Sequence, residues 1–313
     1  MRKEFKNKAE RPMLDEATID AVLDNIEKYE GSTIVIKFGG EMIANEQMLD
    51  DILRQSITLK RHKVNVILVH GGGTQIDDDL AARGIQPGKD EVTGKRMCDE
   101  TVVDVAYDTL RRLNKEVVQK LNTIAKEKGR NIVGMGESGY NGALIRAVPM
   151  HENTRTGNFE MADAEAFKNF ASMNKIPVIY PICMGPDNET LNVNADDVAA
   201  GIALATGASR LIMVTDVPGV WDKNRNPIEE LTIAQVNGLI ADGTISGGMK
   251  PKVEAAMSVA KKGINVVITT PKNDGLLNEL FTEKGSGTMI LSLPKEERLL
   301  PEFLRDLNSR SPS

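Results

Sequence analysis

Short apolar runs that alternate with helical patterns constrain the fold of this chain more than any other feature. From residue 31 onward, the runs with the length and composition of strands are Ser32–Lys37, Val64–His70, Asn131–Met135, Pro177–Tyr180, Arg210–Thr215 and Asn265–Thr269. Helical patterns lie between or after them, at Glu46–His62, Thr74–Arg83, Glu100–Lys128, Ala195–Thr206 and Lys250–Lys262. Apolar strands separated by helices are typical of a parallel sheet that helices cover on both faces. The pattern therefore predicts an α/β fold, a three-layer αβα sandwich around a mainly parallel open sheet.

Three segments fall outside this alternation. Residues 1–30 form an extension in which Leu14–Tyr29 has apolar residues at helical spacing; this helix either packs on its own domain or contacts another subunit. Gly142–Glu160 breaks into short β-like pieces with turn residues, as an inserted hairpin would. Residues 293–313 are charged and contain Pro and Ser, so we expect a partly ordered tail.

Composition limits the classes of partner. The 313 residues are 41% hydrophobic and carry a formal net charge of -6, whereas nucleic-acid-binding proteins usually have a basic excess. Cys98 and Cys183 lack metal-ligand spacing and are expected to be reduced thiols. No stretch approaches the ~20 apolar residues of a membrane span, and the first residues lack the apolar run of a secretory signal. We therefore expect a cytoplasmic protein without a nucleic-acid or membrane partner.

Glycine-rich loops favour a nucleotide enzyme that is neither a P-loop nor a dinucleotide-binding protein. The G-x-x-x-x-G-K-[ST] pattern is absent. Gly134–Gly139 satisfies G-x-G-x-x-G but leads into a β-like piece and not a helix, so we interpret it as a tight turn. More informative are Ile34–Gly40, a strand ending in a lysine and a glycine pair, and Val66–Thr74, a strand ending in a glycine triplet that opens a helix. Two such ends would lie together at the carboxyl edge of the sheet, where ligands bind.

These two loops, in this order, resemble the amino-acid-kinase family, and within it the acetylglutamate-kinase branch. The resemblance extends from about Thr33 to Ile290. Five further ordered blocks carry it: Val92–Arg96, Leu191–Asp196, Val214–Val220, Gly247–Glu254, and Glu279–Thr282 with Gly285–Met289. The resemblance implies two lobes, a substrate lobe over 31–207 and a nucleotide lobe over 208–292. It also implies ATP as cofactor, with Mg²⁺ held by the phosphates and not by protein ligands.

The same resemblance implies roles for individual residues. Lys37 and Lys252 would stabilise the transferred phosphoryl group as catalytic residues, and Asp196 would orient them. The residues implied to bind substrate are Gly72, Gly73, Arg96 and Asn192. Those implied to bind nucleotide are Gly39, Gly40, Asp216, Val217, Gly219, Trp221, Thr244, Ile245 and Ser246.

The residues themselves are consistent with phosphoryl transfer to a carboxylate. Such an acceptor is already ionised near neutral pH, so no general base is needed, and we expect His70 to be structural. Lys252 would lie in the first turn of a helix opened by Gly247 and Gly248, where a cation opposes the helix dipole unless an anion is near. Asp196, by contrast, could simply cap a helix, and Asp197 could do so equally well.

The expected activity is ATP-dependent phosphorylation of the side-chain carboxylate of N-acetyl-L-glutamate, a step of arginine biosynthesis. Departures at Ser138–Gly142 and Thr156–Met161 lie where substrate identity is set, so a related substrate such as an N-acyl-aminoadipate is the alternative. Carbamate, aspartate and UMP are lesser candidates, and aspartokinase is disfavoured because the chain leaves no room for its regulatory domains. A non-catalytic regulatory member would usually have lost one of the three residues Lys37, Asp196 and Lys252.

Regulation by arginine is a further expectation from the resemblance. The Leu14–Tyr29 helix is similar to the extension through which arginine-inhibited members join dimers into hexamers, so a homodimer or hexamer is expected. Glu279 and Gly287 fit the arginine-site segment, whereas Asp274 stands where those members typically have a histidine.

Overall fold

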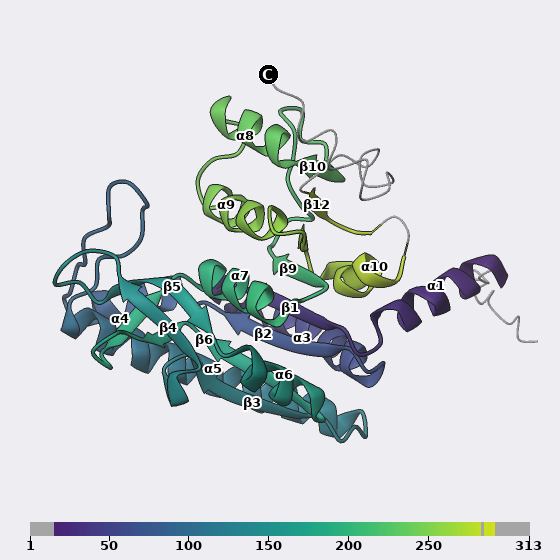
Figure 1. Ribbon diagram of the computed structural model, residues 1–313, viewed down its shortest axis with the longest axis horizontal. Coiled ribbons are helices and arrows are strands. Elements are labelled where there is room, and N and C mark those ends of the chain that lie inside the picture. The colour runs from purple at the N-terminus through teal and green to yellow at the C-terminus, as the bar shows by residue number, and fades with distance from the viewer. Residues whose placement is uncertain (1–15, 283–284, 292–313) are drawn as a thin grey trace, which may run out of the picture.

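A continuous sheet of eight strands runs through the protein, whose computed structural model (Figure 1) describes residues 16–282 and 285–291. The strand order is β10-β12-β11-β9-β1-β2-β6-β3. The strands are β1 (Thr33–Phe38), β2 (Asn65–His70), β3 (Val133–Ser138), β6 (Lys175–Tyr180), β9 (Arg210–Val214), β10 (Glu230–Thr232), β11 (Asn265–Thr269) and β12 (Thr288–Leu291). Neighbours pair in parallel except β11 with β12, which are antiparallel. The predicted mainly parallel open sheet is confirmed.

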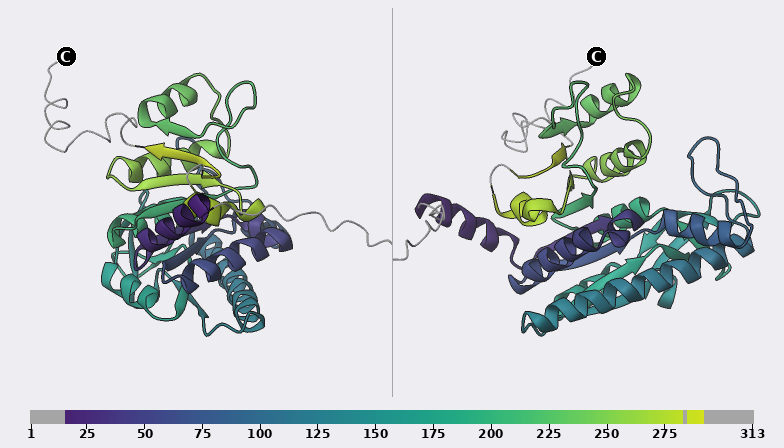
Figure 2. Two further views of the ribbon diagram at one scale, coloured as in Figure 1. Left: turned by 90° about the vertical axis from the view of Figure 1, so that its right-hand side faces the viewer. Right: turned by 180° about the vertical axis from the view of Figure 1, so that it is seen from behind.

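Helices cover both faces of this sheet and complete the three layers (Figures 1 and 2). On one face, α6 (Ala164–Ser172), α7 (Ala195–Thr206) and α9 (Met249–Ala260) pack against the strands, and α8 (Ile233–Ala241) packs on α9. On the other face lie α3 (Glu46–Arg61), α5 (Glu100–Glu127) and α10 (Gly275–Phe281). The helices predicted from periodicity are therefore present, with ends that differ by one to two residues.

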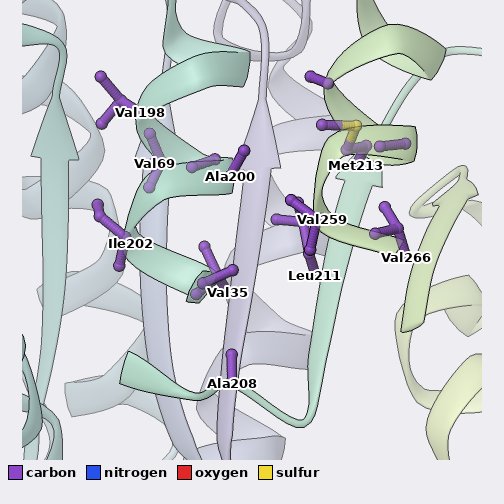
Figure 3. Close-up of a cluster of buried hydrophobic side chains, with 14 of the residues drawn as sticks. Val35, Val69, Val198, Ala200, Ile202, Ala208, Leu211, Met213, Val259 and Val266 are labelled. Carbon is purple, nitrogen blue, oxygen red and sulfur yellow. The ribbon is translucent and has the colours of Figure 1, made fainter. Parts of the chain in front are cut away.

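Strand β1 shows why the apolar runs are continuous. Ile34 and Ile36 belong to the buried cluster that packs on α3 and α5, whereas Val35 belongs to the cluster that packs on α7 and α9. Figure 3 shows Val35 in the second cluster, with side chains of α7, β9 and α9. Because successive side chains of a strand point to opposite faces, a strand covered on both faces has no position for a polar residue until its end.

Four short strands form a separate small β-structure near the carboxyl edge of the large sheet. They are β4 (Ile145–Pro149), β5 (Thr156–Ala162), β7 (Ile182–Met184) and β8 (Thr190–Val193), paired in the closed order β4-β5-β8-β7. The antiparallel β4–β5 pair is the hairpin predicted within Gly142–Glu160. Strands β7 and β8 were not predicted, because strands of three or four residues carry too little periodicity to be recognised.

The Gly134–Gly139 segment was wrongly interpreted as a tight turn. Five of its residues lie in β3, an edge strand of the large sheet, and a short 3₁₀ turn at Asn141–Ala143 follows. A Cβ on Gly136 would collide with the Asn114 side chain of α5, and one on Gly134 would lie 3.2 Å from Leu121. These glycines therefore allow close helix–strand packing, and the segment does not open a helix as a dinucleotide site would.

The N-terminal extension is described from Glu16 onward. Helix α1 (Glu16–Tyr29) forms as predicted and packs against α10, with Val22, Ile26 and Tyr29 turned to the core. Ile19 and Leu23 are exposed. The predicted oligomer contact of this helix remains a prediction, and the C-terminal tail predicted over 293–313 lies outside the described residues. Within those residues, no helix combines the length and apolar character needed to cross a membrane.

Candidate active site

A cleft of about 320 Å³ opens at the carboxyl ends of β1 and β2. Its lining brings together residues predicted from five separate segments of the chain: Lys37, Gly39, Gly40, Gly72, Gly73, Arg96, Asn192 and Lys252. The predicted convergence of the two glycine-rich strand ends at one edge of the sheet is therefore confirmed. Asp196 lies directly behind the cleft, where its carboxylate contacts Lys37.

The two glycine loops touch each other, and glycine is required for the contact. The Gln75 side chain donates a hydrogen bond to the Gly40 carbonyl at 2.8 Å, and a Cβ on Gly40 would collide with that same side chain. A Cβ on Gly72 would lie 2.6 Å from Leu113. Gly72 precedes α4 (Gly73–Ala82), so unpaired backbone N–H groups at the start of this helix face the cleft. The short α2 (Gly40–Ala44) begins at the same place.

Lys37 and Asp196 form a buried ion pair with an Nζ–Oδ1 distance of 2.7 Å and side chains only 5% and 9% exposed. Burial alone would lower the pKa of Lys37, but the charge and hydrogen bond of Asp196, together with the charge of Glu41, outweigh burial and the pKa is raised. Burial would raise the pKa of Asp196, but Lys37 and then Lys252 keep it below its usual value. Both groups are therefore charged at neutral pH. Asp196 does not cap α7, since the Asn194 side chain accepts the capping bond from the Asp196 N–H at 2.7 Å.

Lys252 is the fourth residue of α9, so its predicted place in the first helical turn is confirmed. Burial, followed by the charge of Lys37, lowers the pKa of this half-buried lysine. Two ammonium groups thus face each other beside the carboxylate of Asp196, with Glu41 near enough to favour the charged form of both lysines. Glu41, which was not predicted from the sequence, also lines the cleft. Such a pair of cations at a helix N-terminus favours an anionic ligand.

Arg96 lines the cleft, a position that its spacing in the sequence could not reveal. Its Nη2 lies 2.6 Å from Asp77 Oδ1 and donates to the Gly73 carbonyl at 3.0 Å, and its Nε lies 3.2 Å from the same Asp77 oxygen. Asn192, on β8, also lines the cleft and donates to the Cys98 sulfur at 3.6 Å. Lys95, which was not singled out, lines the cleft beside Arg96.

His70 has the structural role predicted for it. The side chain is fully buried, and burial lowers its pKa to about 4. Its Nδ1 lies 3.0 Å from the Gly71 carbonyl, and its Nε2 lies 3.1 Å from the Asn114 amide nitrogen. A neutral imidazole that donates from Nδ1 and accepts at Nε2 satisfies both contacts. His70 thus holds the glycine triplet from beneath and does not reach the cleft.

The residues predicted to bind nucleotide, apart from Gly39 and Gly40, lie in two loops outside the cleft lining. Asp216, Val217, Gly219 and Trp221 follow β9, which pairs directly with β1, so this loop starts at the same sheet edge as Lys37. Thr244–Ser246 precede α9, the helix of Lys252. Gly219 has a φ of +152°, and a Cβ there would collide with Thr288. Their contact with a nucleotide stays a prediction.

A second cavity of about 810 Å³ lies between α1 and the strands and helix of the C-terminal part. Asp24, Glu229, Glu230 and Glu279 give its lining an acidic character, and Lys28, Arg210 and Gly287 also line it. Glu279 Oε1 pairs with Arg210 Nη1 at 2.7 Å. Of the residues considered for arginine binding, Glu279 and Gly287 therefore lie in this lining, which does not include Asp274.

Comparisons with known proteins agree with this architecture. Acetylglutamate kinase of Brucella anthropi is 36% identical over 299 residues, which cover 90% of this chain and 98% of the relative. Acetylglutamate kinase of Sinorhizobium fredii is 38% identical over 286 residues, which cover 86% of this chain and 94% of the relative.

Solved structures share the fold at lower sequence identity. N-acetylglutamate synthase from Neisseria gonorrhoeae, complexed with coenzyme A and L-arginine, has a TM-score of 0.76 at 21% identity; the match covers 88% of this chain but only 65% of that one. Carbamate kinase from Giardia lamblia bound to AMP-PNP has a TM-score of 0.59 at 16% identity, with 84% and 99% covered. Residues 32–270 match the Amino acid kinase family. With a cleft built from two glycine-rich strand ends and a paired lysine, the chain belongs to the amino acid kinase family.

Proposed function

We propose that this protein phosphorylates the side-chain carboxylate of N-acetyl-L-glutamate with ATP, giving an acyl phosphate in arginine biosynthesis. The observation that carries the proposal is the pair of ammonium groups of Lys37 and Lys252 beside the buried Asp196, in a cleft that Arg96 also lines. Relatives named acetylglutamate kinase, at 36–38% identity over most of the chain, support the choice of acceptor.

Each residue of the cleft has its own role in the proposed reaction. An acceptor carboxylate oxygen attacks the γ-phosphorus of ATP, and negative charge spreads over the transferred oxygens. Lys37 and Lys252 neutralise that charge, while Asp196 fixes Lys37 and keeps it protonated. The backbone N–H groups at Gly72 and Gly73 face the same oxygens. Arg96 and Asn192 hold the amino-acid end of the acceptor.

ATP would bridge the two halves of the chain, the substrate lobe over 31–207 and the nucleotide lobe over 208–292. Its adenosine would lie against the loops at Asp216–Trp221 and Thr244–Ser246, and its phosphates would approach Gly39 and Gly40. Both glycines line the cleft, which supports this placement. In the described part of the chain, no three His, Cys, Asp or Glu side chains are grouped as metal ligands. We infer that Mg²⁺, which offsets charge on the β- and γ-phosphates, would arrive with ATP.

A coupled assay of ADP release tests the proposed acceptor. N-acetyl-L-glutamate should give a kcat/KM at least about tenfold above N-acetyl-L-aminoadipate, carbamate, L-aspartate and UMP, since one methylene is worth about 10–200-fold in a shaped pocket. A higher kcat/KM with the aminoadipate derivative would mean that this derivative is the substrate, while the assignment as a kinase would stand. Nucleotide binding without turnover of any carboxylate would instead favour a non-catalytic regulatory protein.

The acidic cavity beside α1 supports a second proposal, that the enzyme is inhibited by arginine. A guanidinium and an α-ammonium would find carboxylates at Glu229 and Glu279. Arginine at millimolar concentration should raise the melting temperature and lower kcat, and lysine serves as the matched cation. Glu279→Gln is expected to abolish the response. An unchanged melting temperature with arginine would contradict the proposal.

The same helix is our candidate for assembly. The exposed Ile19 and Leu23 of α1 would join homodimers into a hexamer. Light scattering of the full chain measures the assembly, and a mass equal to one or two chains would exclude the hexamer. We place the enzyme in the cytoplasm together with its ATP, which cell fractionation would check.

A further inference from the structure

Lys95 lines the cleft beside Arg96, and two side chains hold its ammonium group in place. Its Nζ donates to Asp197 Oδ2 at 2.8 Å and to Asn158 Oδ1 at 3.1 Å. The side chain is 19% exposed and lines the cleft together with Arg96, Thr156 and Asn192. An ammonium group has three N–H donors. The contacts described for Lys95 use two of them, so a third is available to a ligand in the cleft.

The first turn of α7 anchors two lysines of the cleft. Asp196 pairs with Lys37, and the next residue, Asp197, pairs with Lys95. Successive side chains of a helix point about 100° apart, so two neighbouring carboxylates reach in different directions. The position of Lys95 relative to Lys37 is therefore set by one helical turn and two ion pairs. This relation also separates the roles of Asp196 and Asp197, which the sequence left equivalent.

The contacts of Lys95 are not needed to hold the loop that carries Lys95 and Arg96 in place. The Thr156 hydroxyl donates to the Arg96 carbonyl at 2.7 Å and accepts from the Cys98 N–H at 2.8 Å, and Arg96 is tied to Asp77. An additional ion pair that remains partly exposed contributes little to stability. A cation kept inside a binding cleft is better explained by a ligand than by the loop.

Arg96 alone offers an incomplete grip on a carboxylate. Its Nε and Nη2 are engaged by Asp77 and the Gly73 carbonyl, and its Nη1 takes no part in these contacts. The usual paired donation from one edge of a guanidinium to both oxygens is therefore not offered by the Nε–Nη2 edge. A second donor beside it would complete the recognition. Lys95 is adjacent in sequence and lines the same cleft.

We propose that Lys95 and Arg96 jointly hold the non-reacting carboxylate of the acceptor, with Asp197 as the positioning residue for Lys95. The inference rests on the proposed function, which already assigns Arg96 to the acceptor, and it adds Lys95 and Asp197 to the recognition of the substrate. The second carboxylate of the acceptor would receive donors from Lys95 and Arg96, while the reacting carboxylate would lie near Lys37 and Lys252. We expect acceptors without a second carboxylate to be poor substrates.

The test compares N-acetyl-L-glutamate with its α-carboxamide, which keeps the reacting side-chain carboxylate and loses only the other charge. In the wild type the carboxamide should have the higher KM. Lys95→Met should raise the KM for N-acetyl-L-glutamate about tenfold to a hundredfold, as expected for a lost hydrogen bond to a charged group, and leave the KM for the carboxamide within about threefold. The KM for ATP should not change. The KM for the carboxamide, divided by the KM for N-acetyl-L-glutamate, should therefore be smaller in Lys95→Met than in the wild type.

Two further variants separate substrate contact from a structural role. Asp197→Asn should shift the KM for N-acetyl-L-glutamate in the same direction but less, and Asp197→Glu should restore part of it. Lys120→Met is the matched control, because Lys120 on α5 is 26% exposed and pairs with Asp50 at 2.9 Å and Glu46 at 3.0 Å, outside the cleft lining. It should leave all kinetic constants unchanged.

Failure of this inference is distinguishable from failure of the proposed function. If the wild type turns over the dicarboxylate and Lys95→Met shifts both acceptors equally, or neither, the role of Lys95 is overturned. If the wild type turns over neither acceptor, the proposed function fails, and calorimetric binding of the two acceptors to wild type and Lys95→Met still decides the role of Lys95. Equal affinities in that experiment would overturn it, and a selective loss for the dicarboxylate would support it.

Discussion

Replacing Lys252 by methionine should lower kcat by about a hundredfold to a thousandfold, the usual effect of removing one preorganised donor to transition-state charge. Lys252 is one of the two cleft lysines to which we assign the transferred phosphoryl group. Its side chain is half-buried, and burial and then Lys37 lower its pKa. Burial and Lys37 both disfavour the charge of Lys252, so a charged group at this position indicates a role with an anion. We expect Lys252 to stabilise the phosphoryl group more strongly in the transition state than in the ground state. The KM values should therefore change much less than kcat, which single-turnover kinetics would show directly.

The matched control for this substitution lies in the same helical turn. Lys250 of α9 has a side chain that is 51% exposed and lies 3.9 Å from Glu254. Lys250→Met removes the same charge from the same turn but should leave kcat within about twofold, because a surface ion pair of this kind contributes little. Equal losses in the two variants would mean that the field of the helix matters and not contact with the phosphoryl group. Full activity of Lys252→Met would remove Lys252 from the catalytic machinery.

Asp196→Asn should reduce both activity and stability. The substitution leaves Lys37 charged, buried and without its carboxylate partner, which in other proteins costs about 3–5 kcal/mol in the free energy of unfolding. Lys37 would then lose its proton more easily, because burial and Lys252 both act against its charge. Chemical denaturation should show the loss of stability, and kcat should fall because Lys37 is neither oriented nor fully protonated.

The stability of Asp196→Asn should also depend on pH in a defined direction. In the variant, the pKa of Lys37 falls below the ~10.4 of an exposed lysine, so the unfolded chain binds more protons than the folded chain at alkaline pH. The stability of Asp196→Asn should therefore rise more steeply between neutral pH and about pH 10 than that of the wild type, in which the Lys37 pKa is raised and only other lysines such as Lys252 have a lowered pKa. The double variant Lys37→Met with Asp196→Leu should recover much of the stability but none of the activity. Unchanged stability in Asp196→Asn would show that the pair is not the buried anchor described above.

The predictable part of the fold consists of its long periodic elements. Helices α3, α5 and α7 and strands β1, β2 and β9 bury apolar residues at helical or strand spacing, and a pattern of that length predicts its own structure. The short α2, α6, α8 and α10 were not predicted, since helices of five to nine residues depend on packing and not on their own propensity. The Gly134–Gly139 segment was misread because glycine serves both tight turns and close helix–strand contacts.

The candidate site likewise has features that local sequence patterns predict and features that depend on contacts between distant segments. The sequence by itself determined the αβα sandwich, the two glycine-rich strand ends and the placing of Lys252 in a first helical turn, because each is a local pattern. The resemblance pointed to Asp196 and Arg96, but only the tertiary structure showed that Asp196 and not Asp197 pairs with Lys37, that Arg96 pairs with Asp77 beside the cleft, and that Lys95 and Glu41 line the cleft. Those facts depend on contacts between segments up to about 160 residues apart, such as Lys37 with Asp196. Side-chain direction and burial at such contacts arise from packing, which no spacing in the sequence records.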